Sequence, residues 1–208
     1  MSMATHGEPA KAAPSRRPAR TESTRQKLFD ASMRLIGERG PGNVTVDEIA
    51  AAAGVSKGTV YYNFGSKSDL IAQLLEHGVE LLEERMRTED GDPLQALELT
   101  VAAALDFFAD YPSFAQLLVS EMWRTPSEWR GTLTLLRERL VSIVADAVRR
   151  VAADQPVDPD VPVEGVVGAV FGATFILGLD RQVFHPERTR SEAVAAVMTI
   201  MRGYLRQN

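Results

Sequence analysis

Residues 45–70 read TVDEIAAAAGVSKGTVYYNFGSKSDL, and this stretch predicts two short helices joined by a glycine turn. Thr45 followed three residues later by Glu48 has the pattern of a capping box, which marks a helix start. Gly54 then supplies the turn, because glycine adopts backbone angles that other residues avoid. Ser56 can cap the second helix. Two short helices joined in this way form a helix-turn-helix, a unit that enters the DNA major groove.

The second of these helices, Lys57–Phe64, is expected to carry the contacts to DNA. Val60 and Phe64 lie four residues apart and would anchor it to the core, which leaves two adjacent tyrosines facing outward. Exposed aromatic side chains of this kind indicate a binding surface. Gly58 lowers helix stability by about 1 kcal/mol relative to alanine, and its missing side chain permits a close approach of the backbone.

The stretch GVSKGTVYYNFGSKSDL, residues 54–70, closely resembles the signature of the TetR family of transcriptional regulators, as does TRQKLFDASMRLIGERG, residues 24–40. The glycine turn, the tyrosine pair, the phenylalanine and the lysine that follows all fall at the family's spacing. Two departures are mild. Asn63 stands where the family usually has histidine, and Gly65 stands where it often has proline or another small residue.

The resemblance implies DNA contacts for seven residues. Those expected to contact phosphates are Thr45, Tyr62 and Lys67. Those expected to lie in the major groove are Lys57, Gly58, Thr59 and Tyr61. The chemistry agrees, because lysine supplies a charge for phosphate or guanine, and the hydroxyls pair with base edges or phosphates.

Apolar residues at helical spacing recur along the rest of the chain, so we expect an all-α fold. An N-terminal domain of three helices would contain the helix-turn-helix, and a larger helical domain would bind ligand and dimerise. The expected parts are a disordered basic arm over 1–20, the DNA-binding domain over 21–67 and the effector-binding and dimerisation domain over 68–208. The expected helices of the last part are 68–87, 93–110, 112–124, 127–153, 163–183 and 191–207.

Positive charge is concentrated at the N-terminal end of a chain whose net charge is −5. Residues 1–67 hold 10 Lys and Arg against 6 Asp and Glu, whereas residues 68–208 hold 13 against 22. Such asymmetry is expected where one end of a protein meets a polyanion. Arg16, Arg17 and Arg20 of the arm would reach the minor groove, and a merely solvated tail is an equal alternative.

The composition argues against several classes of protein. The chain has no cysteine, which removes disulfide and thiolate chemistry. His6, His77 and His185 are isolated from one another, so we expect neither an enzyme nor a bound metal or cofactor. Residues 1–20 lack the apolar core of a secretory signal, and the longest uncharged stretch, 165–179, has 15 residues. A cytoplasmic protein without membrane contact is therefore expected.

The resemblance also implies a ligand cavity in the C-terminal part, mostly apolar with few polar groups. The candidates for its lining are Phe107, Trp123, Trp129, Phe171 and Phe175. Packing in the core is the usual fate of such residues and remains the alternative for each one.

The stretch 165–179, GVVGAVFGATFILGL, is apolar around its whole circumference and so must be covered on every side. In the family that the sequence resembles, the last two long helices pair with those of a second subunit. The candidates for this interface are Val170, Ala173, Leu177, Val197, Ile200 and Tyr204. A purely intramolecular role for these helices is the alternative.

Together these patterns predict a ligand-responsive repressor that binds a palindromic operator as a homodimer. A small, largely apolar effector in the C-terminal domain would release it by tilting the helix 68–87 and so resetting the spacing of the two recognition helices. The alternative is a DNA-binding activator or architectural protein without a ligand.

Overall fold

The computed structural model describes residues 17–87, 91–124, 126 and 128–206. Over these ranges the chain is helical, and its extended pairing is confined to one isolated bridge between Val157 and Leu205. The helices are α1 (Arg17–Arg39), α2 (Val46–Ala53), α3 (Lys57–Phe64), α4 (Lys67–Met86), α5 (Pro93–Asp110), α6 (Pro112–Trp123), α7 (Arg130–Asp154), α8 (Val163–Val183) and α9 (Arg190–Tyr204), with a short 3-10 helix at Pro41–Asn43. The predicted all-α fold is confirmed.

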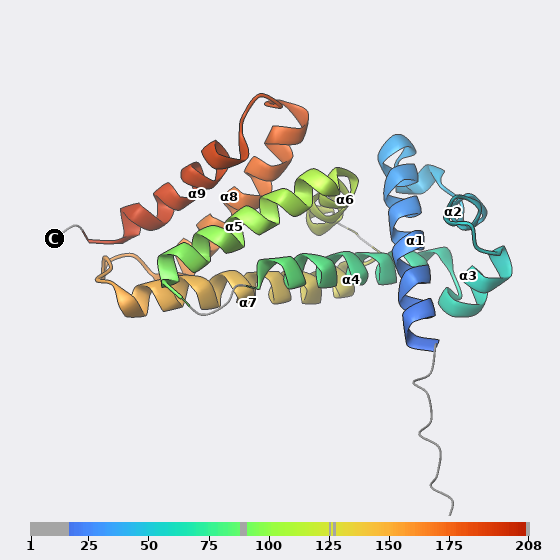
Figure 1. Cartoon of the computed structure of the whole chain (residues 1–208), viewed down its shortest axis with the longest axis horizontal. Coiled ribbons are helices and arrows are strands. Elements are labelled where there is room, and N and C mark those ends of the chain that lie inside the picture. The colour runs from blue at the N-terminus through green and yellow to red at the C-terminus, as the bar shows by residue number, and fades with distance from the viewer. Residues whose placement is uncertain (1–16, 88–90, 125, 127, 207–208) are drawn as a thin grey trace, which may run out of the picture.

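The helices form two groups that α4 connects (Figure 1). Helices α1, α2 and α3 lie at one end of the molecule, where α1 packs on α2, and α3 packs on both α2 and the start of α4. From there α4 runs alongside α7 into the larger group, in which α5 contacts α4, α7, α8 and α9. Helix α4 therefore contacts both groups.

An aromatic cluster joins the two groups in one core. Phe29 of α1 packs edge-on against His77 of α4, with ring centroids 5.5 Å apart, and its ring is tilted against that of Phe114 of α6 at 5.7 Å. Phe107 of α5 in turn meets Phe114 at 5.6 Å. All three phenylalanines are fully buried, and buried aromatic residues contribute large amounts of apolar area.

Helix ends differ from those expected by more than one residue at three places. Helix α1 begins at Arg17 rather than at residue 21, and residues 1–16 of the predicted arm lie outside the described residues. Helix α7 begins at Arg130 rather than at 127. Helix α9 ends at Tyr204 rather than at 207, because the following backbone pairs with the loop after α7: the Arg206 N–H donates to the Pro156 carbonyl at 3.0 Å.

Candidate nucleic-acid interface

The start of α2 is fixed by the capping box that the sequence predicts. The Thr45 hydroxyl oxygen accepts a hydrogen bond from the Glu48 N–H at 3.2 Å, and the Glu48 carboxylate accepts from the Thr45 N–H at 2.8 Å and from its hydroxyl at 2.7 Å. These bonds, led by the one from the Thr45 side chain and joined by one from Arg39, lower the pKa of Glu48 to about 2. Both donors of Thr45 are thus engaged within the chain, so a phosphate contact from Thr45 would have to share them.

The turn between α2 and α3 depends on glycine. Gly54 has a φ of 68°, in the left-handed region, and closes the C-terminus of α2. Ser56 then caps α3 by accepting a hydrogen bond from the Thr59 N–H at 3.1 Å. Val60 and Phe64 of α3 are buried in the core, as their spacing predicts.

The opposite side of α3 presents the predicted contact residues to solvent. Tyr62 is 90% exposed and Tyr61 is 44% exposed. A side chain added at Gly58 would come no closer than 3.9 Å to its nearest neighbour, the Ser56 hydroxyl, so packing within the chain does not require glycine here. An exposed tyrosine pair beside a glycine that the core does not need fits a surface approached by another molecule.

Two polar residues of this side are held by partners in the chain. The Lys57 ammonium lies 2.6 Å from the Asp47 carboxylate on α2 and 5.6 Å from the centroid of the Tyr61 ring. The hydrogen bond to Asp47 raises the pKa of Lys57. The Thr59 hydroxyl lies 2.7 Å from that of Ser56. The role of Asp47 could not be predicted from the sequence, because its partner stands ten positions away on another helix.

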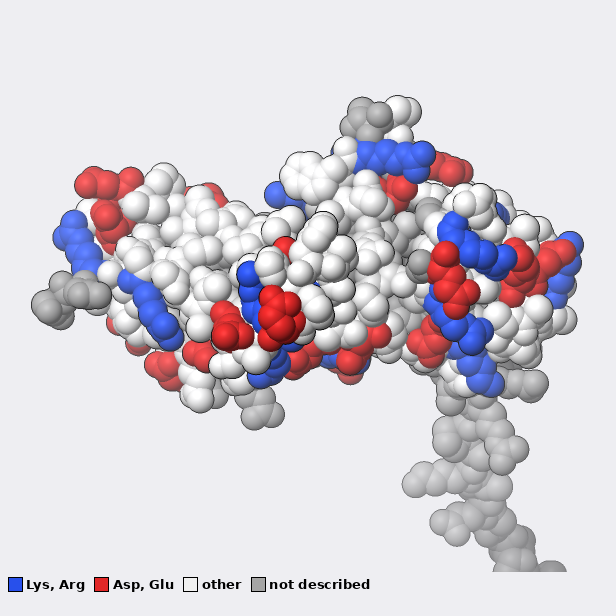
Figure 2. All heavy atoms as spheres, turned by 90° about the horizontal axis from the view of Figure 1, so that it is seen from above, with Lys and Arg blue, Asp and Glu red and all other residues white. Residues whose placement is uncertain are grey.

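Lys67 is the first residue of α4 and follows directly on Ser66, which caps the helix by accepting from the Asp69 N–H at 3.1 Å. The seven predicted DNA contacts therefore occupy the start of α2, the exposed side of α3 and the first residue of α4. Around this end of the molecule, Lys and Arg side chains lie next to Asp and Glu side chains (Figure 2).

Helix α4 is tied to the larger group of helices at both ends. Near its start the Trp129 indole N–H donates to the Ser68 hydroxyl at 3.0 Å and to the Ser68 carbonyl at 3.2 Å. Near its end the Arg139 guanidinium of α7 makes two hydrogen bonds to the Glu83 carboxylate, at 2.9 and 2.6 Å. Glu83 is largely buried, and its hydrogen bond raises the pKa of Arg139.

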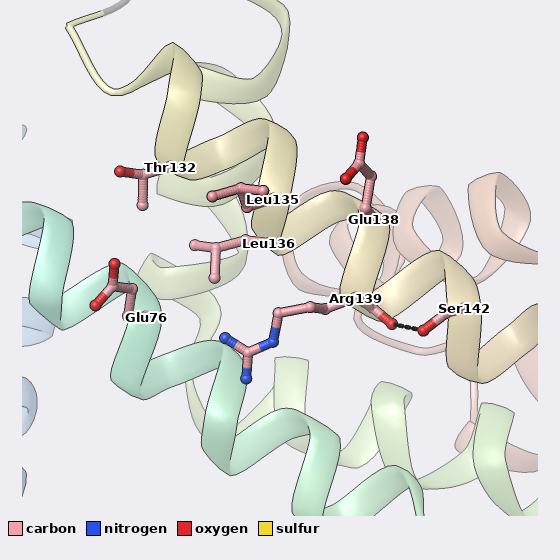
Figure 3. A pocket seen from close by; sticks show the side chains of 7 residues that line it. All are labelled: Glu76, Thr132, Leu135, Leu136, Glu138, Arg139 and Ser142. Carbon is pink, nitrogen blue, oxygen red and sulfur yellow. Dashed lines mark hydrogen bonds between the residues drawn. The ribbon is translucent and has the colours of Figure 1, made fainter.

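A surface groove of about 440 Å³ runs between α4 and α7. Figure 3 shows Arg139 reaching from α7 across to α4, with Glu76 of α4 on the facing side. The residues that line the groove are Glu76, Thr132, Leu135, Leu136, Glu138, Arg139 and Ser142. None of the five predicted pocket residues is among them.

In the described part of the chain, the predicted pocket residues lie in different surroundings. Trp123 is 76% exposed, so it does not line an enclosed site in this structure, and Trp129 is half-buried at the start of α4. Phe107 is fully buried. Phe171 and Phe175 of α8 stack with centroids 4.7 Å apart, and Phe108 of α5 packs on Phe175 at 4.8 Å. An effector would enter this aromatic cluster only by separating its rings.

Three of the six predicted interface residues face the chain's own core in this structure. Val170 and Val197 are fully buried within the chain and Tyr204 is 6% exposed, because these positions face the chain's own core. Ala173, Leu177 and Ile200 are half-buried. Small residues make up much of the exposed faces of α8 and α9, with charged residues near the helix ends. Their exposed residues include Gly168, Ala169 and Ile176 of α8, and Ala195, Ala196, Thr199 and Gly203 of α9.

Helix α8 is also long and apolar enough, by length and composition alone, to cross a membrane. It contacts α5, α6, α7 and α9 on its inward side. Seen from above, on the side where α9 lies, the surface has broad uncharged areas left of the centre (Figure 2).

Residues 28–74, which include the helix-turn-helix, match the sequence profile of the bacterial regulatory proteins of the tetR family. The chain is 38% identical over 80 residues to the HTH-type transcriptional regulator AcrR of Shigella flexneri, covering 36% of this chain and 37% of that one. It is 28% identical over 134 residues to the HTH-type transcriptional repressor BepR of Brucella suis, covering 62% and 63%. These alignments thus span less than two thirds of either relative.

Solved structures share the fold over most of the chain. A TetR-family transcriptional regulator from Rhodococcus sp. superposes with a TM-score of 0.74 at 17% identity, over 89% of this chain and 100% of that one. A transcriptional regulator from Saccharomonospora viridis in complex with choline gives 0.73 at 20% identity, over 89% and 100%. The regulator FadR from Bacillus subtilis in complex with stearoyl-CoA gives 0.67 at 20% identity, over 85% and 95%. With its helix-turn-helix, its family profile over residues 28–74 and this fold, the chain is similar to the TetR family of bacterial transcriptional regulators.

Proposed function

We propose that the chain is a ligand-responsive repressor that binds a palindromic operator as a homodimer and leaves it when a small, largely apolar effector binds the C-terminal part. The observation that carries the proposal is the build of α3. Val60 and Phe64 anchor this helix, while Tyr62 stands 90% exposed on its other side. The relatives named as transcriptional regulators or repressors support the same function.

In this proposal residues 21–67 read DNA and residues 68–208 bind effector and dimerise. Residues 1–20, the last four of which belong to α1, place basic side chains beside the duplex. Lys57, Gly58, Thr59 and Tyr61 lie in the major groove. The phosphate contacts come from Thr45, Tyr62 and Lys67.

A second copy of the chain covers the exposed faces of α8 and α9. Ile176 is 59% exposed amid small residues, and an apolar face of this kind is stabilised when another apolar surface covers it. On a membrane-spanning helix lipid would cover such an apolar face. Here a second copy covers it, so we also propose that the protein is cytoplasmic. A two-fold dimer presents two recognition helices to the two halves of a palindrome.

The effector acts through α4. Two neighbours of this fold hold choline and stearoyl-CoA, which supports a ligand site among the C-terminal helices. The Trp129–Ser68 hydrogen bonds tie the segment before α7 to the first turn of α4, next to Lys67. A ligand that displaces this segment therefore shifts α4 and changes the separation of the recognition helices. The ligand produces this shift only to the extent that it binds the two arrangements of α4 with different affinities.

The test begins with selection of duplexes from a random DNA library by the purified protein. We expect the recovered sequences to share an inverted repeat. Stearoyl-CoA and choline are then titrated into the complex with the selected duplex as first probes. An effector should lower operator affinity by a factor between about 5 and 150, the usual range of such coupling. A library without enrichment contradicts DNA recognition, and tight ligand binding with unchanged operator affinity contradicts release.

Trp129→Phe keeps an aromatic ring but removes the donor to Ser68. We expect the factor by which an effector lowers operator affinity to fall several-fold in this variant, whatever the change in effector affinity. Trp123→Phe is the matched control, because it makes the same chemical change at a side chain that is 76% exposed. Equal coupling in both variants would exclude Trp129 from the transmission.

Lys67→Ala should weaken binding to every DNA sequence and lower the slope of log affinity against log salt by about one, because one phosphate contact is lost. Thr59→Ala and Tyr61→Ala should instead change the preference among operators. Arg150→Ala, an exposed cation on α7, removes the same charge far along the chain and should leave the slope unchanged. If Lys67, Thr59 and Tyr61 variants behave alike, the division into phosphate and base contacts is wrong.

A further inference from the structure

The recognition helix carries a single lysine, and its charge is compensated before DNA arrives. The Lys57 ammonium is 2.6 Å from the Asp47 carboxylate, although both side chains are more than half exposed, at 58% and 55%. The same ammonium lies over the Tyr61 ring at 5.6 Å, within the range of a cation–π contact. Two contacts from different helices therefore hold one exposed side chain in one place.

Asp47 has no other hydrogen-bond or ion-pair partner in the described part of the chain. It belongs to the first turn of α2, where an acidic residue also interacts favourably with the helix dipole. A carboxylate on a surface that is to meet phosphates raises the cost of binding by like-charge repulsion. Helix stability alone does not require it to touch Lys57, since Glu48 already completes the capping box.

We propose that Asp47 is a positioning residue that sets DNA specificity, by holding Lys57 along Tyr61 and withholding its charge from phosphates that the protein meets at random. The inference rests on the proposed DNA binding and extends it to a residue outside the recognition helix. In the free protein Lys57 is thus aimed by Asp47 and Tyr61 instead of moving freely through solvent.

Binding to random DNA and binding to the operator respond differently to the Asp47–Lys57 ion pair. Binding to arbitrary sequence draws its free energy from phosphate neutralisation, so a lysine that is already neutralised adds little to it. Binding to the operator also draws on base edges, which a lysine held in one orientation contacts at a smaller loss of side-chain entropy. Asp47 therefore lowers random binding more than operator binding.

The experiment compares the wild-type protein with Asp47→Asn on two duplexes of equal length, one of random sequence and one selected from a random library by the wild type. Affinities are measured over a series of salt concentrations. For the random duplex we expect Asp47→Asn to bind up to about fivefold more tightly, the upper limit for an exposed ion pair. The salt slope should steepen by about one, because Lys57 then neutralises a phosphate. Operator affinity should change less, so the ratio of the two affinities falls.

Glu38→Gln is the matched control. It removes one negative charge from the same group of helices, at an exposed α1 residue without a hydrogen-bond or ion-pair partner among the described residues. A general effect of net charge would change the affinities for both duplexes by the same factor, in Glu38→Gln as in Asp47→Asn. The ratio of affinities should stay at its wild-type value only in Glu38→Gln.

Asp47→Asn combined with Lys57→Ala separates positioning from direct repulsion. If Asp47 acts through Lys57, the double variant binds both duplexes as Lys57→Ala does alone. A persisting gain on random DNA in the Lys57→Ala background would overturn the inference. A lower pKa of the Lys57 ammonium in Asp47→Asn, followed by NMR titration without DNA, reports the loss of the pair independently.

The outcomes distinguish this inference from the function on which it rests. A wild-type protein that binds neither duplex would refute DNA binding, and the inference with it. A wild-type protein that prefers its selected duplex, together with an Asp47→Asn protein of equal preference and equal salt slope, would refute the role of Asp47 alone.

Discussion

Replacing Ile176 by glutamate is expected to turn the proposed dimer into a monomer and to weaken operator binding by about 100-fold or more, because the two half-sites are then no longer bound as one unit. Ile176 is 59% exposed in the single chain and lies on the face of α8 that we assign to the second copy. Covering an isoleucine stabilises an interface by roughly 1.5–3 kcal/mol. In a two-fold dimer both subunits carry the substitution, so this stabilisation is lost twice and two uncompensated carboxylates would be buried. Sedimentation and operator titration measure the two effects.

Leu99→Glu is the control for this substitution. Leu99 of α5 is 52% exposed, so the same introduction of a charge at an exposed aliphatic residue is made on a different helix. We expect this variant to remain dimeric and to bind the operator as the wild type does. Because both positions are exposed in the single chain, circular dichroism should show a folded protein in both cases. A dimeric Ile176→Glu protein with full operator affinity would remove α8 from the interface.

The helix-turn-helix could be predicted from the sequence because its signals are local. The Thr45–Glu48 capping box, the turn at Gly54 and the anchors Val60 and Phe64 each act within a few residues, and the structure shows all of them as expected. Local hydrogen bonds and helical spacing suffice to place these side chains.

The facing of α8 could not be predicted, because the helix is apolar around its circumference and its periodicity does not point to one side. The structure turns Val170 and Phe171 inward and leaves Gly168 and Ala169 exposed. On its inward side α8 comes close to Phe108 of α5 at Gly178, where an added side chain would lie 2.7 Å from the Phe108 ring. That contact joins residues seventy positions apart, beyond the reach of a local pattern.

The apolar stripe of α9 also could not be assigned to one covering surface from the sequence. Val197, Met201 and Tyr204 form a buried stripe, as their spacing indicates, but they are buried against the chain's own core. Periodicity shows that a face is covered and does not say by which chain. Residue type is similarly insufficient to place a side chain in a pocket: Trp123, a large aromatic residue expected there, is exposed at the end of α6.

Gly78→Ala is expected to destabilise the protein by about 1–3 kcal/mol, the usual cost of overpacking a filled core. Gly78 is buried in the middle of α4, and an added Cβ would lie 2.7 Å from Cδ2 and Cζ of Phe114. The Phe114 ring has little room to retreat, because Phe29 and Phe107 pack on its other sides. Alanine otherwise favours a helix by about 1 kcal/mol, so the sign of the measured change reports the contact. Urea unfolding followed by circular dichroism measures it.

Gly131→Ala tests the helix propensity without the contact, because an alanine side chain at this exposed position of α7 would meet nothing within 4 Å. Its free energy of unfolding should stay the same or rise slightly. Phe114→Leu provides the decisive second change, since the smaller side chain opens space beside residue 78. Combined with Gly78→Ala, it should cost less than the two substitutions do separately, as expected for residues in contact. Additive losses would show that α4 and α6 do not meet at this point.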